Sequence, residues 1–251
     1  MTRYLFIAAS VLAFSFMVVA QNTRNLTPLE IEIQKQQQRL SSGDQEERRE
    51  AIMKLGGMRL AAASRAALAG LKDPSPVIRA TATKAILWIG EEESAAALLP
   101  LLNDKDEFVR REAAYALGRT HSRNATAALI ERLLKDKEDG VQGAAAVALG
   151  EIADEAAVVP LVGVLSRERN PFVLRSVAAA LGQIGSRAAT AALVSVLTNE
   201  KLDSDVRREA ARSLGLIGDP SAEPALRAAS TSEDPYLSRI AFESLKKLSR
   251  G

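Results

Sequence analysis

The side chains that most often carry out catalysis or hold metal ions are scarce in this sequence. The chain of 251 residues has one histidine, His121, and no cysteine. A histidine-rich or thiolate metal centre needs three or four such ligands, so neither kind is expected. Carboxylates are plentiful, but they stand at expected helix starts and on exposed faces, and no catalytic pair can be nominated. The sequence therefore predicts no catalytic residue, no metal and no cofactor.

Arginine and aromatic side chains remain as candidates, and their chemistry would be binding. Both types are favoured as anchors of protein interfaces. Two of the few aromatic residues, Trp88 and Tyr115, recur at related positions near Lys84, Arg111 and Arg119. We expect this cluster to bind a partner, and the alternative is an ordinary solvated face. The expected partner-binding residues are Lys84, Trp88, Arg111, Tyr115, Arg119, Arg175, Arg208 and Arg212.

A repeated pattern fixes where these side chains lie. Alignment on a Leu-Gly step gives the series Gly56, Leu87, Gly118, Gly150, Gly182, Gly215 and Lys246. Subtraction gives spacings of 31, 31, 32, 32, 33 and 31 residues, so about seven copies fill the chain from residue 27 onward. Repeats of this length indicate a stack of small units, each too small to bury its apolar face alone.

Each copy ends in an amphipathic helix. Apolar residues recur nine, five and one residues before the aligned step and two after it, and these positions fall on one face of a helix. Good helix-capping residues stand three residues before the first apolar position, and a second helical stretch precedes each copy. A glycine inside a helix costs roughly 1 kcal/mol relative to alanine, so its return suggests that the next helix presses against it.

The motif "(V)R-x-x-A-A-x-A-L-G-x-I-G" resembles the HEAT-repeat family and its phycobilin-lyase-like form. Clear copies are "VRREAAYALG" at 109–118 and "VRREAARSLG" at 206–215. The resemblance implies an all-α fold, an α-solenoid of about seven two-helix repeats in a right-handed superhelix. The second helix of each repeat would line the concave face. The outward positions of these helices hold nine basic and five acidic residues, and they include the candidate partner-binding side chains.

A second set of arginines follows the first apolar position of four copies. The resemblance implies that such arginines pair with recurring aspartates in a ladder that links the units, although a basic strip for an anionic partner is the alternative. The expected ladder residues are Arg48, Arg79, Arg110, Arg207, Asp73, Asp104 and Asp136. His121 occupies the column of Gly90, Gly185 and Gly218 just past a helix end, which predicts a capping or solvent role.

The first twenty residues differ from the rest. Arg3 precedes an uncharged apolar run over 4–20 that ends in small residues, which predicts a signal peptide cleaved after Ala20. The alternative is an uncleaved membrane anchor. The expected organisation is therefore a leader at 1–20, an N-terminal segment with the first helix at 21–43, and the solenoid at 44–251.

These observations favour an exported, non-enzymatic scaffold, periplasmic or secreted, that binds an acidic or extended segment of a partner protein along its concave face. The resemblance leaves a second possibility, a bilin lyase-like enzyme or chaperone acting on a client protein. The formal net charge of +2 is nearly balanced and argues against nucleic-acid binding. Membrane association would arise only through an uncleaved N-terminal segment.

Overall fold

The computed structural model describes residues 26–168 and 170–248, and all regular secondary structure in these ranges is helical. The predicted leader at 1–20 lies outside the described residues. Within the described ranges, none of the helices combines the length and the apolar character needed to cross a membrane.

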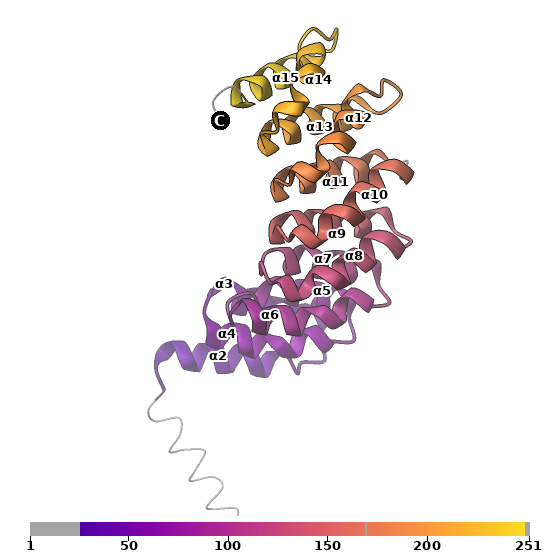
Figure 1. Cartoon of the computed structure of the whole chain (residues 1–251). Coiled ribbons are helices and arrows are strands. Elements are labelled where there is room, and N and C mark those ends of the chain that lie inside the picture. The colour runs from indigo at the N-terminus through magenta and orange to yellow at the C-terminus, as the bar shows by residue number, and fades with distance from the viewer. Residues whose placement is uncertain (1–25, 169, 249–251) are drawn as a thin grey trace, which may run out of the picture.

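The helices form two parallel rows along a single curved rod. The odd-numbered row is α3 (Gln45–Gly57), α5 (Pro76–Ala85), α7 (Glu107–Gly118), α9 (Asp139–Ile152), α11 (Pro171–Ile184), α13 (Ser204–Ile217) and α15 (Pro235–Leu248). The even-numbered row is α2 (Pro28–Arg39), α4 (Ala61–Ala67), α6 (Glu91–Leu98), α8 (Thr126–Lys135), α10 (Val158–Arg167), α12 (Thr190–Thr198) and α14 (Glu223–Ala229). Figure 1 shows that the rod is curved and that the odd-numbered row lies on its concave side, called here the inner face.

Short 3-10 turns complete the even-numbered row. Those after α4 and α6 are Leu68–Lys72 and Leu99–Asn103, and those before α8, α10, α12 and α14 are Arg123–Ala125, Glu155–Ala157, Arg187–Ala189 and Pro220–Ala222. Several helix starts follow the expected capping chemistry, although Ser75 at α5 and Glu138 at α9 make no side-chain capping hydrogen bond. Thr27 and Glu30 form a reciprocal capping box at α2, and Pro171 occupies the first turn of α11.

The core lies between the two rows and follows the apolar columns of the sequence. The residues four positions after the first column are all buried, namely Ala51, Ala82, Ala113, Ala145, Val177, Ala210 and Ala241. Because small side chains fill this column, the helices of successive pairs can pack closely. The core is therefore continuous along the rod, each pair burying the apolar face of its neighbours.

The recurring glycines are the points where successive odd-numbered helices touch. A Cβ atom added to Gly118 or Gly150 would lie 2.8 Å from the Cα atom of Ala148 or Ala180 on the next helix. Gly182 meets Ser213 in the same way, with a distance of 2.9 Å to the Cα atom. The aligned glycine is thus required by contact between backbones.

The second copy departs from this arrangement. Leu87 stands where most other copies have glycine, and α5 ends at Ala85, two residues before it. Trp88, which the repeat pattern predicts on a helix, therefore lies in the turn after α5. At the equivalent glycines, even a Cβ atom would lie 3.0 Å or less from the backbone of the next helix. A leucine side chain therefore cannot fit at this position of the row, and the helix ends early. The prediction of a helical Trp88 is wrong for this reason.

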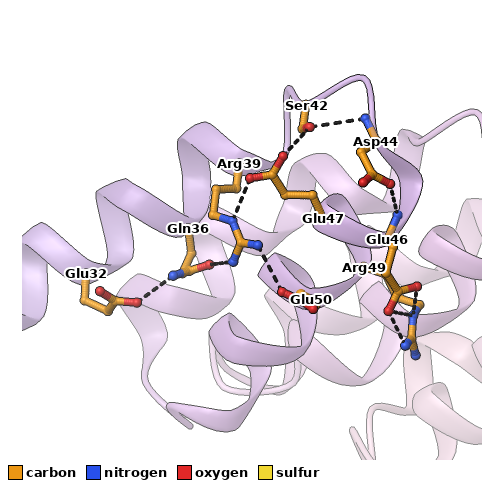
Figure 2. Close-up of polar contacts among 9 residues, drawn as sticks. All are labelled: Glu32, Gln36, Arg39, Ser42, Asp44, Glu46, Glu47, Arg49 and Glu50. Carbon is orange, nitrogen blue, oxygen red and sulfur yellow. Dashed lines mark hydrogen bonds and ion pairs between the residues drawn. The ribbon is translucent and has the colours of Figure 1, made fainter.

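A polar network replaces the apolar column in the first pair. Glu47 stands where later copies have valine, isoleucine or leucine, and its carboxylate accepts hydrogen bonds from Arg39 at 3.0 Å and Ser42 at 2.5 Å. Arg39 also donates to Glu50 and to Gln36, each at 3.0 Å (Figure 2). This network fastens α2 to α3 where the repeat pattern of the core begins.

Candidate functional site

The inner face carries a hollow of about 420 Å³ on α3, α5 and α7. Its lining residues are Arg49, Ile52, Met53, Gly56, Ala80, Thr81, Lys84, Ala85, Phe108 and Glu112. The side chains of Met53 and Phe108 are exposed there, at 54% and 39% of their surface. An apolar floor with charged residues around it is typical of a binding surface.

Ion pairs hold the charged side chains around this hollow. Lys84 lies 2.7 Å from the Glu112 carboxylate, and Arg49 pairs with Glu46 across one turn of α3 at 2.5 Å (Figure 2). Arg111 covers the ring of Phe108, with its guanidinium carbon 5.0 Å from the ring centre. The guanidinium of Arg111 approaches Glu112 only to 3.8 Å, so its donors are largely available to a partner.

A larger hollow of about 610 Å³ lies on the even-numbered row, beside Leu71, Ala97 and Pro100. Its lining holds no aromatic residue and only two charged ones, Lys72 and Asp104, the second of which is bound to an arginine. The inner hollow therefore offers the stronger combination of anchors.

The predicted cluster is only partly brought together. Lys84 lines the hollow, and Arg111 is held against Phe108 at its edge. Trp88 faces Arg59, whose guanidinium carbon lies 5.8 Å from the ring centre. Tyr115 is half-buried and packs against the core, and Arg119 is exposed after the end of α7. Of the five predicted residues, only Lys84 contributes to the wall of the hollow.

Sequence reasoning missed Met53 and Phe108. Met53 stood in an outward column of mixed character, half of whose other members are charged. Phe108 lies one residue before the first apolar position, a column that the outward-face count left out. The signal for Phe108 was nevertheless present, because Phe172 and Tyr236 occupy the same column in later copies.

Three arginine–aspartate pairs link successive units through their loops. The Nε atoms of Arg48, Arg79 and Arg110 lie 2.8, 2.7 and 2.8 Å from the carboxylates of Asp73, Asp104 and Asp136. Each arginine also donates to backbone carbonyls of the loop before its own helix, as Arg110 does to Asp104 O at 3.0 Å. The series ends at α9, where Gln142 takes the arginine position and donates to Asp136 O at 2.6 Å.

Arg207 is not part of this ladder, contrary to the prediction. Its Nε donates to Leu197 O at 3.0 Å, because the position that should supply an aspartate holds Ser232. The next arginine pairs instead: Arg208 forms two 3.0 Å hydrogen bonds to Asp234 and a 2.7 Å ion pair with Asp205. Arg208, predicted to bind a partner, thus fastens α13 to α15.

The other two predicted arginines of the C-terminal half are exposed. Arg212 approaches Glu209 at 3.8 Å on its own helix. Arg175 has no ion pair among the residues that the structure describes. Both remain available to a partner on the inner face.

The ladder aspartates have pKa values below the usual range. Burial raises the pKa of the Asp136 carboxyl, but the hydrogen bonds from Arg110 and from the Glu138 N–H outweigh burial, and the net pKa is lowered. The same balance lowers the pKa of Asp73 and of Asp104. These carboxylates are therefore favoured in their charged form in the folded protein.

Stability should fall in acid because of these shifts. A depressed folded pKa contributes stability that is complete above the unfolded value of about 3.9 and is lost as the pH falls through the folded pKa. We expect a melting temperature that is steady from pH 7 to 5 and falls steeply below about pH 4. Thermal melts of the wild type and of Asp136→Asn across this range would check it. An equally steep acid loss in the variant would show that Asp136 does not contribute.

His121 lies past the end of α7 with a positive φ of 53°, in the column where three other copies have Gly90, Gly185 and Gly218. Its side chain is exposed, and Nδ1 lies 2.9 Å from the carbonyl oxygen of Glu151 near the end of α9. A helix end has unpaired carbonyls that such a contact satisfies. Within the described residues, no three His, Cys, Asp or Glu side chains form a group that could hold a metal ion.

Comparison with solved structures finds the same architecture. The chain is 26% identical to a chain of the complex of CpcE and CpcF of phycocyanin lyase from Nostoc, with a TM-score of 0.55 and coverage of 90% of this chain and 92% of that one. It is 15% identical to the karyopherin Kap121p bound to the extreme C-terminus of the phosphatase Cdc14p, with a TM-score of 0.62, covering 95% of this chain and 32% of that one. An engineered protein is 24% identical, with a TM-score of 0.55 and coverage of 88% and 69%.

No match was found among curated proteins. Two family models match the sequence directly. The PBS lyase HEAT-like repeat matches residues 109–135, and HEAT repeats match residues 33–118, 126–204 and 199–250. Because these matches cover most of the chain and the structure is a stack of helix pairs, the protein belongs to the HEAT-repeat family.

Proposed function

We propose that this HEAT-repeat protein is an exported, non-enzymatic scaffold that binds a partner protein along its inner face. The observation that carries the proposal is the hollow on α3, α5 and α7, where Met53 and Phe108 are exposed between charged side chains. The apolar run at 4–20 supports export to the periplasm or beyond the cell. Rigid units that present spaced side chains bind with little loss of conformational freedom, so a few anchors set the affinity.

The partner should be sought by crosslinking in the extracytoplasmic fraction, followed by mass spectrometry and purification. The double variant Met53→Ala with Lys84→Ala should weaken binding of that purified partner about tenfold or more, because both residues line the hollow. Leu134→Ala is a matched control, since Leu134 is exposed at 44% on α8 in the other row. Calorimetry would measure both. Unchanged affinity in the double variant would place the binding site elsewhere.

A lyase-like role is the second candidate, and the 26% identity to the phycocyanin lyase structure supports it. Phycocyanin carries a bilin chromophore, so a protein with this role should bind a bilin. The visible spectrum of a free bilin should then shift when the protein is added. An unchanged spectrum would exclude this role, while the scaffold proposal would stand.

A further inference from the structure

Three helices of the inner row begin with the same pair of side chains. An aromatic residue is followed three positions later by an arginine at the start of α7, α11 and α15. The six residues are Phe108, Arg111, Phe172, Arg175, Tyr236 and Arg239, called here the aromatic–arginine row. Subtraction gives 64 residues between the first and second aromatic and 64 between the second and third, so the pair returns in every second repeat.

Equivalent Asp or Asn caps place the three aromatic residues. The backbone N–H of Phe108 donates to Asp106 Oδ1 at 3.0 Å. Phe172 donates to Asn170 Oδ1 at 2.8 Å, and Tyr236 to the capping aspartate of α15 at 3.0 Å. Each aromatic is consequently the second residue of its helix. The three side chains are 39%, 40% and 58% exposed, so part of each ring surface remains accessible to a partner.

The helix between the first two pairs has glycine at the corresponding positions. A Cβ atom on Gly143 would collide with the ring of Phe172, which therefore leans onto α9. A Cβ atom on Gly140 would meet only Arg111, at 3.7 Å or more, so packing does not demand glycine at position 140. Glycine in a helix weakens it, and one use of such a site is the close approach of another backbone.

The guanidinium groups of the row have N–H donors that are available to a partner. Arg175 and Arg239 have no ion pair within the described ranges, and Arg111 approaches Glu112 only to 3.8 Å while Lys84 holds that carboxylate at 2.7 Å. Arg239 lies over the ring of Tyr236, as Arg111 lies over that of Phe108. A guanidinium held against a ring keeps its edge free to bind a carboxylate through two parallel hydrogen bonds.

We propose that the aromatic–arginine row binds an extended segment of a partner protein that presents an apolar residue beside a carboxylate at regular intervals. The proposal rests on the scaffold function above and adds the chemistry of its partner. Packed helices lie 8–10 Å apart, so pairs in alternate repeats are roughly 16–20 Å apart. An extended chain rises about 3.3 Å per residue, which gives an interval of about five to six residues. Side chains alternate between the two sides of an extended chain, so an even interval of six keeps both on the same side.

Carboxylates between the pairs restrict the charges that the partner segment can carry between its contact residues. Asp139 and Asp205 stand at the starts of α9 and α13, between the pairs. Arg208 offsets the charge of Asp205, so Asp139 is the carboxylate that would repel a uniformly acidic chain. The intervening residues of the partner should therefore be uncharged. The same carboxylate and the net charge of +2 disfavour a nucleic acid, whose phosphates lie at every nucleotide.

The test uses the full chain and three fluorescein-labelled peptides, each with two Glu-Leu-Glu clusters joined by uncharged residues. Their leucines are four, six or eight positions apart. We expect the six-residue spacing to bind most tightly, about tenfold or more above the others in fluorescence anisotropy, because both clusters then engage at once. Phe172→Ala should remove this preference. Val159→Ala, which changes a side chain 79% exposed on α10, should leave it intact.

Equal affinity for all three spacings, or a preference that survives Phe172→Ala, would overturn the proposal. So would tighter binding of an oligothymidine with steep salt dependence, which would indicate a nucleic-acid surface. The scaffold proposal is tested by a different experiment, which measures binding of the isolated partner to the Met53 and Lys84 double variant. Neither residue belongs to the aromatic–arginine row, so the two proposals can fail independently.

Discussion

Replacing Arg110 with leucine is expected to lower the free energy of unfolding by about 3–5 kcal/mol. The side chains of Arg110 and Asp136 are only 8% and 2% exposed. The variant leaves the aspartate charge buried, with the Glu138 N–H at 3.2 Å and Arg132 at 3.8 Å as its remaining partners. Urea unfolding followed by circular dichroism would measure the loss.

Arg207→Leu provides the matched control. Arg207 occupies the equivalent position of a later helix, but its described hydrogen bond reaches a neutral carbonyl, so its removal should cost only about 1 kcal/mol. The double variant Arg110→Leu with Asp136→Leu should recover much of the loss, because it removes both charges. If Arg110→Leu cost no more than Arg207→Leu, the ladder would not stabilise the stack.

The second large effect concerns the glycine contacts. Gly150→Ala should lower the free energy of unfolding by about 1–3 kcal/mol, because the new methyl group would lie 2.8 Å from the Cα atom of Ala180 and the backbones must separate. Gly163→Ala should raise it by about 0.5–1 kcal/mol, since the methyl group would meet only the far end of the long Arg167 side chain, at 3.3 Å, and no backbone atom.

The two substitutions are chemically identical and both fall inside helices, so helix propensity favours alanine equally in each. Opposite signs in parallel urea titrations would isolate the effect of the contact between helices. Stabilisation by both alanines would mean that successive helices are not held at the distance that the structure shows.

Much of the fold could be predicted from the sequence, because apolar residues recur at the same spacing in each copy and this spacing determines which side chains are buried. Ala113 and Val177 are buried for the reason that their column implies, and the glycine column marks the contacts between helices. The early end of α5 could not be predicted in this way. It depends on how closely a neighbouring backbone approaches Leu87, which is a property of the packed stack.

The candidate site was less accessible to sequence reasoning. The outward columns included Lys84, which lines the hollow, and Arg111, which lies at its edge, but curvature and local turns decide which outward residues surround a hollow. The exchange of roles between Arg207 and Arg208 depended on a partner 26 residues downstream of Arg208, at Asp234. Phe108 was overlooked because an aromatic residue beside an apolar column resembles part of the core.

The distribution of the loop ion pairs has a mechanical consequence. Arginine–aspartate pairs join the units from α3 to the loop after α8, and Arg208 joins α13 to α15. Within residues 139–168 and 170–217, no arginine–aspartate pair joins successive units, and apolar packing and hydrogen bonds such as that from Asn170 to Asp139 hold this stretch. Bending should therefore concentrate in the middle of the rod, between two stiffer ends. A partner that contacts both ends of the rod would bend this central section. Its affinity would then depend on the free energy needed to change the curvature of the rod.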